Sequence, residues 1–111
     1  MNKDKLLVNK ATTGDSEVRT TEGSLFAKGQ VSAQATVSGT GLVSATIDFK
    51  ISNDGIGWIT AATFTLSGTN LDSSIVKIDD FDADNKLFES YKATVSSISG
   101  TGAVVNFTLV S

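Results

Sequence analysis

Alternation of apolar and polar residues with a strict period of two dominates this chain. In residues 43–51 the odd positions, among them Val43, Ile47 and Phe49, are apolar and lie on one face. The even positions carry polar side chains and lie on the other. A period of two over nine residues is the pattern of a half-buried β-strand. The tetrapeptide Ser-Gly-Thr-Gly occurs at residues 38–41 and again at 99–102, each time between two such runs. Strand, glycine turn and strand predict two similar β-hairpins.

Further alternating runs predict the remaining strands. They cover residues 30–37, 58–66, 88–98 and 103–110, with a short strand or edge at 74–78. Turn-forming residues separate them at 52–55 and 67–70, and no segment has a helical period. The pattern predicts an all-β fold, an antiparallel β-sandwich of the jelly-roll or immunoglobulin-like kind.

The apolar faces of the clearest strands predict the hydrophobic core. Trp58 is expected to share a face with Thr60, Ala62, Phe64 and Leu66, since they lie at every second position. Six side chains are expected to be buried at the centre: Ile47, Phe49, Phe64, Val105, Phe107 and Leu109.

The N-terminal residues differ from the rest of the chain. A length of 111 residues predicts one domain, but residues 1–23 carry mixed charge and little periodicity. We expect 1–23 to form an extended N-terminal arm and 24–111 the β-sandwich domain. Burying a leucine is worth about 1.5–3 kcal/mol, so Leu6, Leu7 and Val8 are predicted assembly residues that add to a neighbouring subunit. The expected partner is a further copy in a homo-oligomer, of which a closed trimer is one form.

Composition excludes several classes of chemistry. The chain has no Cys and no His, which removes the usual zinc, copper and haem ligand sets and any Ser-His or Cys-His nucleophile pair. A net charge of −3 argues against a nucleic-acid partner. Apolar runs are too short for a membrane span, and the charged start does not resemble a secretory signal peptide. We therefore expect synthesis in a cytoplasm, followed by retention there or release by lysis or within a particle.

An acidic segment is the one metal candidate. Asp80, Asp82 and Asp84 are spaced like the first ligands of an EF-hand calcium loop. The sixth position is Asn85 instead of Gly and the twelfth is Tyr91 instead of Glu, so the motif is incomplete. The alternative is a solvated acidic loop, and we expect no cofactor, with calcium as the only candidate.

The single tryptophan follows a tight turn. Trp58, with Asn53 and Asp54 just before it, could stack on a sugar ring while the polar pair binds hydroxyl groups. The competing interpretation, which we favour, is that Trp58 covers one end of the core, since large aromatic side chains usually serve burial.

These sequence features resemble those of small β-sandwich virion proteins encoded by tailed bacteriophages. The Ser-Gly-Thr-Gly turns, the strand at 43–51 with its turn and Trp58, and the segment 91–102 carry the resemblance, which covers residues 31–110. The Asn-Asp-Gly-x-x-Trp piece also resembles a turn in discoidin-like carbohydrate-binding sandwiches.

The resemblance implies a non-enzymatic virion structural protein with no catalytic residues. We expect a capsid decoration or cement protein, located in the virion, made in the bacterial host cytoplasm and bound to the major capsid protein. The alternative is a carbohydrate- or receptor-binding module of a tail or fibre.

Overall fold

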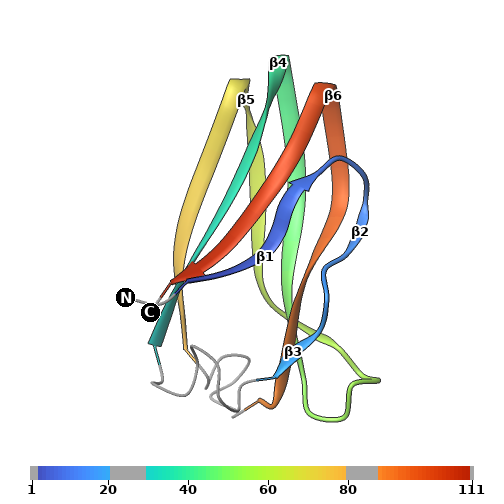
Figure 1. Cartoon of the computed structure of the whole chain (residues 1–111), viewed down its shortest axis with the longest axis vertical. Coiled ribbons are helices and arrows are strands. Elements are labelled where there is room, and N and C mark those ends of the chain that lie inside the picture. Colours follow the sequence, from blue (N-terminus) through green and yellow to red (C-terminus); the bar gives the residue numbers. More distant parts are fainter. Residues whose placement is uncertain (1–2, 21–29, 80–87, 111) are drawn as a thin grey trace.

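The computed structural model describes residues 3–20, 30–79 and 88–110. These residues form three short strands, β1 (Lys3–Lys10), β2 (Gly14–Asp15) and β3 (Arg19–Thr20), and three long ones, β4 (Gln30–Ser52), β5 (Ile59–Asp79) and β6 (Ser90–Val110). All pairings are antiparallel, in one six-stranded sheet of order β1-β6-β4-β5, with β2 and β3 also paired to β6 (Figure 1). The all-β, antiparallel prediction is therefore confirmed.

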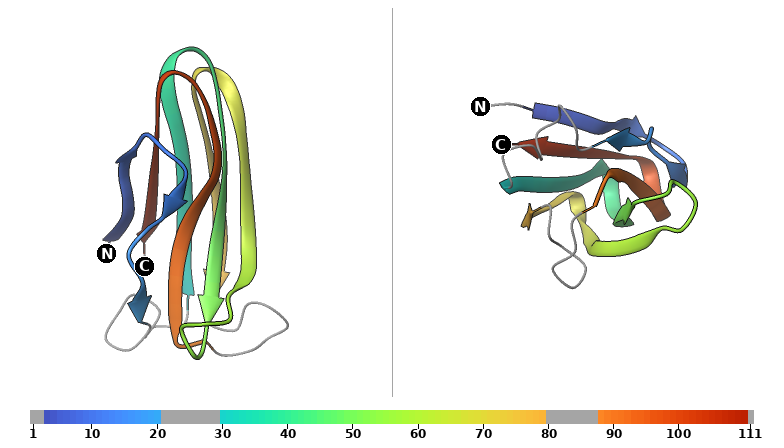
Figure 2. Two further views of the ribbon diagram at one scale, coloured as in Figure 1. Left: turned by 90° about the vertical axis from the view of Figure 1, so that its right-hand side faces the viewer. Right: turned by 90° about the horizontal axis from the view of Figure 1, so that it is seen from below.

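Each long strand bends near its middle, and the three bends lie together at one end, which we call the tip (Figures 1 and 2). In β4, residues 30–38 pair with 71–79 of β5 and 104–110 of β6, whereas the residues after the bend pair with 59–69 and 90–99. We call the part of the sheet built on 30–38 half A and the part built on 42–52 half B. The described strands thus form one folded sheet, and the two separate sheets of a jelly roll or immunoglobulin-like sandwich are not what the pairing shows.

The Ser-Gly-Thr-Gly turns lie at the tip, but the prediction of hairpins was wrong. The two arms of β4 do not pair with each other; each pairs with β5 and β6. A third, imperfect copy, Ser-Gly-Thr-Asn at 67–70, forms the bend of β5. The last residue of every copy has a left-handed backbone, with φ of 76° at Gly41, 66° at Asn70 and 64° at Gly102. Glycine adopts this conformation without strain and asparagine tolerates it better than most residues.

The core lies between the two halves of the folded sheet. All six residues predicted for it are buried. Phe107 of half A stacks on Phe49 of half B, with ring centroids 6.1 Å apart, and meets the edge of Phe64 at 5.3 Å. Odd positions on each arm of β4 point inward, which is why the period of two in the sequence located the core.

Residues 3–20 belong to the same sheet and do not form an extended arm in the described structure. β1 pairs with β6, and the side chains of Leu6 and Leu7 are buried while that of Val8 is 61% exposed. Register shifts between Lys5 and Leu7 and between Leu7 and Lys10 break the alternation, so two consecutive leucines both face inward. These irregularities hid the strand from the sequence pattern.

A polar network fixes this segment at the sheet edge. The hydroxyl of the fully buried Tyr91 donates to Asp4 Oδ2 at 3.1 Å, and Arg19 Nε lies 3.5 Å from the same oxygen. The Arg19 guanidinium also bonds the Glu17 carboxylate, which raises the pKa of Arg19. β1, β3 and β6 are thereby linked through one carboxylate. Among the described residues, no helix is long and apolar enough to cross a membrane.

Candidate functional site

The calcium candidates Asp80, Asp82 and Asp84 lie outside the described residues. In the part of the chain that the structure describes, no three or more acidic, histidine or cysteine side chains gather as a metal site.

The turn at 53–57 uses the polar side chains that were candidates for sugar binding. Asp54 Oδ1 accepts the backbone N–H groups of Ile56 at 2.8 Å and Gly57 at 2.9 Å, and the Ser52 hydroxyl lies 3.1 Å away. These bonds favour the ionised carboxylate and lower the pKa of Asp54. Asn53 Oδ1 accepts the backbone N–H of Glu89 at 2.9 Å. Both side chains therefore hold the shape of the loop.

Trp58 does not share a face with Phe64 and Leu66. A register shift in the β4–β5 pairing sets Phe49 opposite Ala62 but Lys50 opposite Thr60, so one extra residue of β5 is accommodated there. Such a bulge reverses the side-chain alternation beyond it. Trp58 is half-buried, and its ring lies under the ammonium of Lys92, with 4.4 Å from Nζ to the ring centroid. The prediction that Trp58 covers the core was wrong for this reason.

Lys92 lies between Trp58 and an acidic side chain from β2. Its Nζ is 3.0 Å from Asp15 Oδ2, and the Thr94 hydroxyl donates to Asp15 Oδ1 at 2.7 Å. The Thr94 hydrogen bond, followed by that of Lys92, lowers the pKa of Asp15. The arrangement balances its charges internally and attaches β2 and the Trp58 loop to the outer side of half B.

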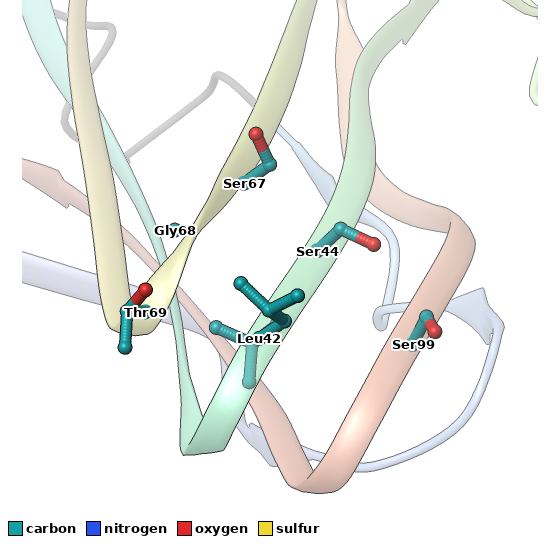
Figure 3. A pocket seen from close by; sticks show the side chains of 7 residues that line it. Leu42, Ser44, Ser67, Gly68, Thr69 and Ser99 are labelled. Carbon is teal, nitrogen blue, oxygen red and sulfur yellow. The ribbon is translucent and has the colours of Figure 1, made fainter.

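A hollow on the outer side of half B, next to the tip, is a second candidate site. Its volume is about 340 Å³, at the small end of ligand pockets. Ser44 of β4 lies opposite Ser67 of β5 on one side and Ser99 of β6 on the other, so three hydroxyl groups form a row across three strands. Thr69 and the 81% exposed Leu42 stand beside this row (Figure 3).

The hollow offers hydrogen bonds and one apolar wall, and none of the described residues that line it is charged. It suits a neutral group that bears hydroxyls or amides. None of its residues was a site candidate from the sequence, because serine and threonine at outward strand positions are common. The threefold recurrence of the Ser-Gly-Thr motif was the available signal.

The assembly candidates separate into two environments. Leu6 and Leu7 contact the chain's own core, and Val8 points outward from β1. The apolar surface that motivated a role in assembly is therefore satisfied within the chain for two of the three residues.

Comparison with known proteins supports the fold only. No protein-family model matches this chain. No curated protein matches it by sequence. Among solved structures, the SPBc2 prophage-derived protein YomS matches 99% of this chain and 95% of its own, with a TM-score of 0.55 and 17% identity. The chain thus shares an all-β fold, over nearly its whole length, with a protein of prophage origin.

Proposed function

We propose that this chain is a non-enzymatic structural protein of a bacteriophage particle, acting as a decoration or cement protein on the capsid. One observation carries the proposal: the fold is shared, end to end, with a prophage-derived protein. In this role its partners are the major capsid protein and further copies of itself, and its location is the virion, after synthesis in the bacterial host cytoplasm.

The surface features on the described residues are consistent with a binding role without catalysis. Asp54 and the Asp15–Lys92 pair are engaged in hydrogen bonds that hold strands and loops. Both carboxylates have a lowered pKa, the opposite of the raised pKa that a general acid at neutral pH needs. The serine row lacks an adjacent basic side chain in the hollow's lining.

The test is the location of the protein in particles. Phage particles of the encoding genome are purified on a density gradient, analysed by mass spectrometry and labelled with gold-conjugated antibody for electron microscopy. We expect multiple copies per particle and label on the head. Protein that stays in the soluble lysate and is absent from intact particles would refute the proposal.

The second candidate is a carbohydrate- or receptor-binding module of a tail or fibre. The tip hollow, with its row of hydroxyl groups and exposed Leu42, is the observation that favours it over the Trp58 loop, whose polar groups are engaged. Gold label on the tail, together with binding of host surface glycans that Leu42→Ala weakens and Trp58→Phe does not, would support this candidate.

A further inference from the structure

The turn between β4 and β5 contains an aspartate followed directly by a glycine, Asp54-Gly55. It is the one Asp-Gly pair of the sequence, which has no Asn-Gly pair. Both residues are exposed, and a Cβ added to Gly55 would meet no atom within 4 Å. Since glycine carries no side chain, nothing on Gly55 shields its amide nitrogen from the carboxyl group of Asp54.

An Asp-Gly pair can rearrange without any added reagent. The Gly55 nitrogen loses its proton and bonds to Cγ of the protonated Asp54 carboxyl, whose hydroxyl leaves with a proton as water, and a succinimide ring closes. Water then adds to the former backbone carbonyl carbon of Asp54, and the bond from that carbon to the Gly55 nitrogen breaks. The chain now continues through the side-chain carboxyl carbon, the α-carboxyl is free, and the mass is unchanged. The product is isoaspartate, which lengthens the backbone of the turn by a methylene group.

In the folded chain one serine hydroxyl contacts both reacting groups. Ser52 Oγ accepts the N–H of Gly55 at 3.0 Å and donates to Asp54 Oδ1 at 3.1 Å. The same Oδ1 also accepts the N–H groups of Ile56 and Gly57. Ser52 is buried at the end of β4, so these bonds have a fixed anchor.

The hydrogen bonds oppose ring closure at both atoms. The Gly55 N–H is held by a buried hydroxyl instead of a base in water, and its bond to Ser52 is lost when the nitrogen bonds to Cγ. The donors on Oδ1 stabilise the ionised carboxylate, which is a much poorer target for attack than the protonated acid. Closure would also exchange their charge-assisted bonds for weaker ones to a neutral imide oxygen. The folded turn therefore favours the unreacted aspartate.

We propose that Asp54-Gly55 is a latent site of isoaspartate formation, which the hydroxyl of Ser52 keeps inactive in the folded chain. The site reacts when the turn opens. The product loses the acceptor that holds the N–H groups of residues 56 and 57, directly before Trp58. A chain that has reacted should consequently refold with a looser Trp58 loop.

Peptide mapping after prolonged incubation in neutral buffer tests the site. Peptides of equal mass that contain Asp54 or isoaspartate separate by chromatography, and isoaspartyl methyltransferase labels only the isoaspartate form. In wild-type protein we expect isoaspartate to accumulate at least about tenfold faster in urea than in the folded state, because unfolding opens the turn. A wild-type chain that reacts equally fast in both states, or that forms no isoaspartate at residue 54 in urea, would overturn the proposal.

Two serine variants test the part played by Ser52. Ser90 lies opposite Ser52 in the β4–β6 pairing and is buried to a similar extent, so Ser90→Ala is a matched control. We expect folded Ser52→Ala to react about fivefold faster than wild type, the factor that one lost hydrogen bond corresponds to, and Ser90→Ala to react at the wild-type rate.

Circular dichroism verifies that each variant is folded. Ser52→Cys, kept reduced, has a similar volume but is only a weak acceptor, so it should react like Ser52→Ala and replaces that variant if it unfolds. A folded Ser52 variant that reacts no faster than Ser90→Ala would contradict the assigned role. Any of these results leaves the virion role untouched, since the reaction is a property of the chain alone.

Discussion

At the scale of single residues, the second and fourth positions of the tip motif favour glycine for different reasons. The second position is crowded: a Cβ on Gly100 would lie 2.7 Å from the carbonyl oxygen of Leu42, and one on Gly68 2.6 Å from that of Leu71. The fourth position is open but left-handed. Asn70 takes this position in the third copy, and its Oδ1 accepts the N–H of Gly41 at 2.7 Å, which joins two of the bends.

Alanine at two of these glycines compares an unfavourable backbone conformation alone with one that is also crowded. Gly102→Ala meets no atom within 4 Å but has φ of 64°, so we expect a loss of about 1–2 kcal/mol of unfolding free energy. Gly100, with φ of 123°, is also unfavourable for alanine, and its Cβ would in addition clash with backbone atoms, for which overpacking contributes about 1–3 kcal/mol more. Urea unfolding of both variants measures the difference, and equal losses would contradict the close packing of the tip.

Asp54 makes part of the stability dependent on pH. Its pKa is lowered in the folded protein by the N–H groups of Ile56 and Gly57, so its contribution is complete above the unfolded pKa of about 3.9 and is lost as the pH falls through the lower folded value. We expect Asp54→Asn to be less stable than wild type at pH 7, with the gap closing as the pH falls below about 4. The urea midpoints of both proteins from pH 7 to pH 2 test this, and a gap that stays constant would disprove it. Asp15 titrates in the same direction in both proteins and so cancels in the comparison.

At the scale of elements, the sequence pattern placed side chains on the correct face where strand pairing is regular, and failed where it is irregular. Residues 43–51 keep their alternation because their inward positions pair without a shift up to Phe49. The bulge beyond Phe49 moved Trp58 to the outer side, and the shifts in β1 turned both Leu6 and Leu7 inward. Whether a strand carries an extra, unpaired residue depends on how it pairs with its neighbour. The spacing of apolar residues along one segment therefore does not reveal it.

β1 offers a matched pair of substitutions. We expect Leu7→Ala to cost about 2–5 kcal/mol, because the side chain is buried in the chain's own core. Val8→Ala, at the neighbouring exposed position, should change stability by no more than about 0.5 kcal/mol. Thermal unfolding at low protein concentration is the measurement. If Leu7→Ala leaves the monomer's stability intact and only impairs assembly, the original idea of an intersubunit arm is restored.

At the scale of the whole molecule, β4 is the central strand and pairs along both sides of each half. The sequence predicted the all-β class, the antiparallel character and the central core residues, because each follows from local alternation. It did not predict that β5 and β6 lie beside both arms of β4, since those pairings join residues far apart in the chain. For the candidate sites, the sequence predicted a turn at 52–55, whereas the tip hollow depends on three strands meeting and could not be predicted.

The rates of amide hydrogen exchange should differ between the central strand and the edge of the sheet. We expect the amides of β4 to be the slowest, since opening energies rise from near zero at open edges to the global value in core strands. Amide directions alternate along a strand. Along β5, the amides of Ile75 and Lys77 should exchange at least about 100-fold faster than those of Val76 and Ile78, which point toward β4. NMR-detected exchange at low protein concentration tests this, and uniform protection along β5 would show that its edge is covered within the monomer.

The pairing of Lys3 with Val110 sets the start of β1 beside the end of β6, away from the tip (Figures 1 and 2). A polypeptide joined before Lys3 and another joined after Val110 would leave the molecule from the same place. Reporter domains or displayed peptides can therefore be fused on either side without obstructing the bends, and a short linker between the two positions would permit a circularly permuted chain that opens elsewhere.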